Sequence, residues 1–176
     1  MPPPLGDLLA LFALTIVAKG PQAFLLPFSY EPIVIAYGRL YPALLVAAVA
    51  ALGTVSVEWV NYHVFRAVID SPVCAAAHRS ATAHRIARWF SWKPFLTVAL
   101  GALLPLPFGL VRIAALLGGY PAGRYLAATA VGRFPRYWFY AAVGAALTLP
   151  PGLVVAAGVL AAVLPLAAYR AALKSA

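Results

Sequence analysis

Residues 105–138 read PLPFGLVRIAALLGGYPAGRYLAATAVGRFPRYW, and residues 27–59 carry the same spacing of prolines, glycines and aromatics. In both stretches a Pro-Phe pair is followed at +11 by Gly and then by a Tyr-Pro pair. A second Gly comes 11 residues after that proline, and Trp follows six residues later. A gap of one residue aligns the two stretches. A duplicated apolar unit interrupted by Pro and Gly predicts a pseudo-symmetric membrane carrier whose site lies where the repeats meet.

The composition around this repeat is that of a membrane protein. Of 176 residues, 64% are hydrophobic and 10% are charged, with a mean hydropathy of +0.91. Soluble domains carry about 25% charged residues. We therefore expect residues 1–176 to form a single, all-α integral membrane domain. The net charge of +9 comes from basic residues scattered between apolar runs, so the expected partners are membrane lipids with anionic headgroups, and not nucleic acid.

Each repeat is predicted to hold a re-entrant helical hairpin followed by a long helix. Repeat one covers residues 22–66, and repeat two covers residues 95–147. Prolines inside an apolar run disrupt a straight helix, and such breaks are tolerated at membrane depth only under a cover of protein or in a watery cavity. The predicted hairpin breaks are at Pro27, Pro32, Pro105, Pro107 and Gly109.

The rest of the chain supplies a linker and the flanking helices. Residues 70–94 form a basic linker, which is either a solvated connector or a helix lying on the lipid surface. Basic loops stay in the cytoplasm, so we place this linker there. Residues 153–169 are predicted to cross the membrane, whereas residues 5–18 are short for a span of about 20 residues.

Counting crossings from a cytoplasmic linker gives a topology. About four helices cross the membrane, the two hairpins enter from opposite faces as an inverted repeat, and the C-terminus is cytoplasmic. The expected location is the bacterial inner (plasma) membrane.

Charged residues inside the apolar segments are the candidate substrate-binding residues. Each costs at least about 2.5–3.5 kcal/mol at mid-helix. The acids fall in repeat one and the arginines in repeat two, and the alignment puts them at nearly equivalent places. We expect at least one acid to pair with an arginine. These candidates are Glu31, Glu58, Arg112, Arg133 and Arg136.

The arginines outnumber these two acids by one, so full pairing would leave one positive charge. A guanidinium can hold a phosphate through two parallel hydrogen bonds, which favours an anionic phosphate-bearing substrate. The alternative is structural: the acid–arginine pairs lock the hairpins in place.

No residue pattern indicates catalysis, a metal or a cofactor. Cys74 stands alone, and the three histidines lack the spacing of metal ligands. No nucleophile has a base near it in sequence, as covalent catalysis would require. A carrier is therefore favoured over an enzyme. A structural or assembly membrane protein and, less favoured, a membrane lipid phosphatase remain open.

Two stretches resemble the signatures of the DedA/VTT (SNARE-associated, YqaA-like) superfamily. LLPFSYEPIVIAYG (25–38) is similar to its first hairpin, and PLPFGLVRIAALLGGYPAGRYLAATAVGRFPRYW (105–138) is similar to its second. In this resemblance Glu31 takes the place of the family's hairpin Glu, and Arg112 that of its second-hairpin Arg. Two features depart from the pattern: Thr54 stands where many members have an acid, and Leu106 where many have a further Arg.

The resemblance implies two re-entrant hairpins in an inverted repeat and a role as a lipid flippase or scramblase. Bacterial members are linked to undecaprenyl phosphate or glycerophospholipid recycling, often with proton coupling.

Overall fold

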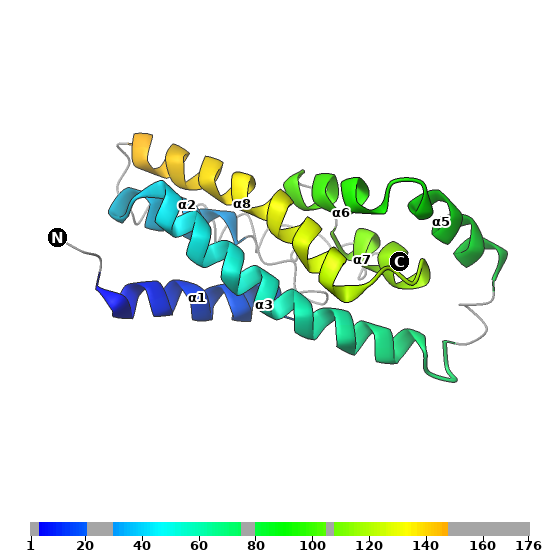
Figure 1. Ribbon diagram of the computed structural model, residues 1–176. Helices are drawn as coiled ribbons and strands as arrows, with labels where there is room; N and C mark the ends of the chain where they lie inside the picture. Colours follow the sequence, from blue (N-terminus) through cyan, green and yellow to red (C-terminus); the bar gives the residue numbers. More distant parts are fainter. Residues whose placement is uncertain (1–3, 21–29, 75–79, 105–107, 148–176) are drawn as a thin grey trace, which may run out of the picture. The chain divides into compact units, whose positions relative to one another are not determined.

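The computed structural model describes residues 4–20, 30–74, 80–104 and 108–147, and this part of the chain is all-helical (Figure 1). The seven helices of the described part are α1 (Leu5–Lys19), α2 (Glu31–Leu40), α3 (Ala43–Ile69), α5 (Ala81–Ser91), α6 (Pro94–Leu103), α7 (Phe108–Leu117) and α8 (Ala122–Ala146). The predicted helix 153–169 and the predicted breaks at Pro27, Pro105 and Pro107 lie outside the described residues.

The helices group into two compact units that do not follow the two repeats. Unit 1 comprises residues 1–50 and 137–176, and unit 2 comprises residues 51–136. Unit 1 therefore contains α1, α2, the start of α3 and the end of α8. Unit 2 contains α5, α6, α7, the rest of α3 and the start of α8. Each unit thus combines the hairpin region of one repeat with the C-terminal part of the other repeat's long helix.

Among the described helices, α3 alone is both long and apolar enough to cross a membrane by its length and composition. It has 27 residues and a mean hydropathy of 2.0 over its most apolar window. α8 has 25 residues, but its arginines and tyrosines lower its hydropathy. α6 and α7 are apolar and have ten residues each, about half the length that a crossing needs.

Close backbone contacts at glycines hold α2 and α8 together in unit 1. A Cβ added to Gly38 of α2 would collide with the backbone of Ala141, and one added to Gly144 of α8 would collide with that of Ile35. Small residues at helix contacts allow such close approach, which is a main source of packing energy between membrane helices. The glycine that ends the first hairpin motif is therefore a packing residue.

α6 and α7 form the hairpin-like pair of unit 2, side by side in Figure 1. A Cβ on Gly101 of α6 would lie 2.7 Å from the Val111 side chain of α7. The buried residues of α7 include Phe108, Arg112 and Ala115, at the helical spacing i, i+4, i+7 that marks one face. That face carries the only charged side chain among the buried residues of α7.

The structure limits the two predicted breaks. Pro32 lies in the first turn of α2, where its missing N–H costs nothing, so it begins a helix. Gly109 lies within α7, which begins at Phe108. The helix therefore starts before the C-terminal end of the second predicted break. Glycine costs a helix only about 1 kcal/mol, and burial of Phe108 and Arg112 on α7 offsets that cost.

The linker predicted at residues 70–94 contains a helix. Ser80 begins α5 by accepting a hydrogen bond from the Ala83 N–H, 3.1 Å away, as a Ser N-cap does. α5 packs against α7, with Ala83 and Phe90 buried. Residues 81–91 of the linker are therefore helical and packed through one face, while contact of the other face with water or with lipid stays a prediction.

Gly132→Ala is expected to destabilise the protein by about 1–3 kcal/mol, the usual cost of overpacking. A Cβ on Gly132 of α8 would collide with the Ala99 carbonyl of α6 and lie 2.7 Å from the Ala102 Cβ. Gly123, on the same helix, has nothing within 4 Å of such a Cβ. Gly123→Ala is the matched control and is expected to leave stability unchanged or raise it. Thermal unfolding in detergent measures both, and equal effects would contradict the predicted contact.

Candidate functional site

The buried polar residues of unit 2 that belong to the two long helices lie along one face of each. On α3, Thr54, Glu58 and Asn61 are buried at the spacing i, i+4, i+7. On α8, the residues Tyr125, Thr129 and Arg133 are buried at the spacing i, i+4, i+8. Residues three, four, seven or eight apart share a helix face. Both long helices therefore direct a polar stripe into the interior of the unit.

Glu58 is the centre of these polar contacts. Arg112 of α7 donates two hydrogen bonds to its carboxylate, from Nη2 to Oε1 at 2.6 Å and from Nε to Oε2 at 3.1 Å. Tyr125 donates to Oε2 at 2.8 Å, and the Asn61 amide lies 3.4 Å from Oε1. The carboxylate thus accepts from three side chains on three helices. The guanidinium of Arg112 also stacks on Phe65, 5.0 Å from the ring centroid.

This ion pair is buried, with side-chain exposure of 10% for Arg112 and 3% for Glu58. A buried pair holds only if good geometry and further hydrogen bonds offset the loss of water. Both conditions are met here, because the contact is bidentate and Tyr125 adds a third strong donor. The predicted pairing of an acid from repeat one with an arginine from repeat two is confirmed for Glu58 and Arg112.

Arg133 differs from Arg112 in its surroundings. Its side chain is buried, its guanidinium lies 4.8 Å from the centroid of the Phe108 ring, and its Nε has no hydrogen-bond partner. Within the described residues no carboxylate forms an ion pair with it. A buried donor without a partner is costly, so this guanidinium is the strongest candidate in unit 2 for receiving an anion.

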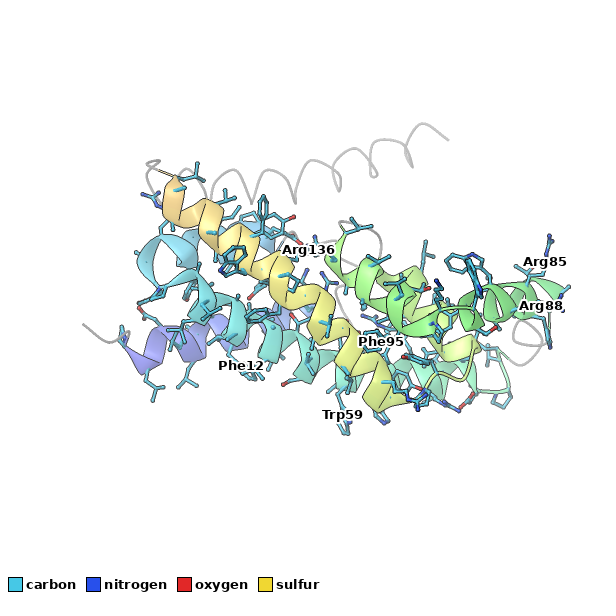
Figure 2. All side chains as sticks on the ribbon, turned by 45° about the horizontal axis from the view of Figure 1, so that its top comes forward. Phe12, Trp59, Arg85, Arg88, Phe95 and Arg136 are labelled. Carbon is cyan, nitrogen blue, oxygen red and sulfur yellow. The ribbon has the colours of Figure 1, made fainter. Side chains whose placement is uncertain are left out.

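Arg136 lies one turn further along α8 and contacts the end of α6 (Figure 2). Its Nη1 donates to the carbonyl of Leu104 at 2.7 Å, just after α6 ends at Leu103. Arg133 contacts Phe108, the first residue of α7. The two arginines therefore contact the two ends of the break between α6 and α7.

Glu31 belongs to unit 1, where the Lys19 Nζ lies 3.9 Å from its Oε1. Lys19 also lies over the ring of Tyr30, 5.3 Å from the centroid. Tyr30 hydrogen-bonds Thr15 of α1 and packs edge-on against Tyr137 of α8 at 5.6 Å. The substrate-binding role of Glu31 stays a prediction, as does that of the other four charged residues.

Sequence reasoning missed Tyr125 and Asn61 as partners of Glu58. A signal for both was present, since Asn61 follows Glu58 by three residues and Tyr125 precedes Arg133 by eight. Reading the polar residues of each long helix as a stripe would have found them. The buried Tyr62 was missed as well. Its hydroxyl donates to the Tyr120 carbonyl at 2.6 Å, and its ring packs against that of Tyr125 with centroids 5.4 Å apart.

Tyr125→Phe is expected to lower stability by about 1.5–3 kcal/mol, the usual worth of a hydrogen bond to a charged group. The ring would still fill its site, so the loss reports the missing hydroxyl. Tyr62→Phe is the control: its hydroxyl donates to the uncharged Tyr120 carbonyl, so its loss should cost less, about 0.5–1.5 kcal/mol. Thermal unfolding in detergent measures the difference, and an unchanged midpoint for Tyr125→Phe would mean that water replaces the hydroxyl.

Comparison with known proteins identifies the family of the chain. No curated protein and no solved structure matches it. Residues 26–146 match the VTT domain. This range holds the first hairpin motif from residue 26 on, the whole of the second, Glu58 and all three candidate arginines. The chain is therefore a membrane protein of the VTT-domain (DedA/SNARE-associated) family.

Proposed function

We propose that this protein is a carrier that moves a phosphate-bearing anionic lipid between the leaflets of its membrane. Arg133 and Arg136 receive the phosphate beside the break between α6 and α7, and the Glu58–Arg112–Tyr125 cluster holds the helices around it. The observation that carries the proposal is the buried Arg133 guanidinium, whose Nε lacks a hydrogen-bond partner.

The charges of unit 2 support an anionic substrate. Glu58 and Asp70 are the only acids between residues 51 and 136. Glu58 pairs with Arg112, and Asp70 pairs with Arg66 at 3.3 Å. No acid of the unit is left to neutralise Arg133. A phosphate oxygen is a strong acceptor for a guanidinium and would supply the missing charge.

The composition of the two units supports an inverted repeat with re-entrant hairpins. In the repeat alignment Glu58 of α3 corresponds to Tyr137 of α8. Glu58 contacts Arg112, in the second hairpin, and Tyr137 contacts Tyr30, next to α2 in the first. Equivalent positions of the long helices thus contact the hairpin of the opposite repeat. Two-fold pseudo-symmetry produces such an exchange, and carriers use it to expose one site to either side in turn.

The topology belongs to the same proposal. α3 crosses the membrane, the hairpins enter from opposite faces, and the linker and the C-terminus lie in the cytoplasm. An undecaprenyl phosphate and a glycerophospholipid share the phosphate that Arg133 and Arg136 would hold, so the chemistry of the site admits both.

A leaflet-exchange assay on the full chain tests this proposal. Proteoliposomes receive a fluorescent lipid in one leaflet, and its arrival in the other leaflet is followed with an impermeant quencher. We expect transfer of a polyprenyl phosphate or a phospholipid, and none of a glucosylceramide, which has a polar headgroup but no phosphate. Comparison of the first two lipids separates the candidate substrates. A pH difference across the vesicle wall tests proton coupling.

Two outcomes would overturn the carrier. Absence of transfer above protein-free vesicles for every lipid would leave the structural or assembly role. Release of inorganic phosphate from the lipid would indicate a phosphatase, although members of this family are generally not enzymes.

A further inference from the structure

The outer face of α5 is both basic and aromatic. Trp89 is 67% exposed, and Trp92, just past the helix end, is 81% exposed. Arg85, Arg88 and Lys93 are exposed beside them, and Figure 2 shows both arginines projecting from the helix. Lys93 lies over the ring of Trp92, 5.3 Å from its centroid. We call these five residues the α5 surface.

The opposite face of α5 is fixed to the core of unit 2. Phe90 is 1% exposed and packs edge-on against Tyr120 with ring centroids 5.6 Å apart. It also sits close to Gly118, whose added Cβ would lie 3.0 Å from the Phe90 ring. With Phe90 anchored, the α5 surface cannot turn inward to cover its tryptophans. The described helices of unit 2 leave these tryptophans exposed, so a partner of the α5 surface comes from outside this unit.

The charge of the α5 surface identifies that partner. All four acids of the chain lie at or before Asp70, and among the described residues none of them forms an ion pair with Arg85, Arg88 or Lys93. Anionic lipid headgroups attract basic residues near a membrane surface by about 1 kcal/mol each. Tryptophan prefers the same depth, because its ring is apolar and its N–H is polar.

The apolar surface of the next helix, α6, indicates the depth of the α5 surface in a bilayer. α6 begins immediately after the α5 surface, and its exposed residues Phe95, Leu96 and Leu100 are all apolar. The chain therefore passes within a few residues from exposed cations, through tryptophans, to an exposed apolar face. This is the order of surroundings from headgroups to acyl chains.

We propose that α5 lies on the anionic surface of one leaflet, with Trp89 and Trp92 at the level of the headgroups. The partner of the α5 surface is a bilayer containing anionic phospholipid. Arg85, Arg88 and Lys93 contact the phosphates, and α6 continues into the acyl chains. The proposal goes beyond lipid transfer, because a membrane protein of any function could be anchored in this way.

Tryptophan fluorescence of the full chain in vesicles tests the depth. Variants keeping only Trp89 or only Trp92, with the other three tryptophans replaced by Phe, are reconstituted in phosphatidylcholine with and without phosphatidylglycerol. With phosphatidylglycerol, we expect quenching by neutral acrylamide about twofold weaker than for a tryptophan in water. Lipids brominated near the carbonyl should quench more strongly than lipids brominated near the chain end.

The variant R85Q/R88Q tests the charge. It should increase acrylamide quenching and remove its dependence on phosphatidylglycerol and on salt. Arg66→Gln is the matched control, since Arg66 is an exposed arginine of the same unit paired with Asp70, and it should change neither. Acrylamide quenching equal to that of a tryptophan in water, with or without phosphatidylglycerol, would overturn the proposal and favour a soluble partner. The proposal would also be overturned if acrylamide quenched R85Q/R88Q no more strongly than the protein that keeps both arginines.

Discussion

Arg133→Gln is expected to reduce lipid transfer about a hundredfold, equal to roughly 2.7 kcal/mol, and to leave the fold intact. The guanidinium is buried, and its Nε has no hydrogen-bond partner, so its removal breaks no ion pair. Glutamine can donate to a phosphate but carries no charge. Since an unpaired buried charge is itself costly, the variant should be at least as stable as the parent.

Leaflet exchange and thermal unfolding, measured on the same preparation, check both halves of this result. Arg133→Lys should recover only part of the transfer, because lysine keeps the charge but lacks the planar fork. Arg124→Gln removes an exposed arginine of the same helix and should leave transfer unchanged. If Arg133→Gln transferred lipid at the full rate, Arg133 would not be part of the substrate site. The protein would still be a carrier.

Glu58→Gln is expected to have the largest effect on stability, a loss of about 3–5 kcal/mol. It leaves Arg112 with its charge but without its carboxylate in a site where only 10% of the side chain is exposed. Tyr125 and Asn61 also lose a charged acceptor. The variant should unfold at a markedly lower temperature or denaturant concentration.

The double variant E58Q/R112Q separates loss of the pair from loss of one partner. Replacing both charges removes the unpaired guanidinium, so most of the lost stability should return. Asp70→Asn is the surface control, because Asp70 and Arg66 are about half exposed and such pairs contribute at most about 1 kcal/mol. If the double variant is no more stable than Glu58→Gln, the cost does not come from the isolated charge of Arg112.

The structure shows how the candidate charges pair, which a count of charges in the sequence does not. A count of charges in the sequence assumes that Glu31, Glu58 and the three arginines all lie close enough to pair with one another. In the structure Glu58 is paired with Arg112, and Glu31 of the other unit has Lys19 as its ion-pair partner. Among the described residues Arg133 is the buried arginine that has no carboxylate beside it, and under the proposed function Arg112 holds the helices around it. Transfer should consequently depend on Arg133 more directly than on Arg112.

Sequence alone determined the membrane character of the protein, its helical class and its family. Apolar content depends on composition, and helix ends depend on local residues such as Pro32, Ser80 and Pro94, so neither requires knowledge of the packing. α3 could be predicted as one long helix, because its residues are mostly apolar and no proline interrupts them. The repeat of prolines, glycines and tryptophans indicated which segments correspond to each other.

Only the tertiary structure decided which charges meet. Glu58 and Arg112 are 54 residues apart in the chain, and Glu58 and Tyr125 are 67 apart. Helical periodicity places a residue on a face but does not say which helix covers that face. That choice depends on close contacts such as the one between Gly132 and Ala99, where the absence of a side chain lets two helices approach. The geometry of packing, and not the count of charges, left Arg133 buried without an acid.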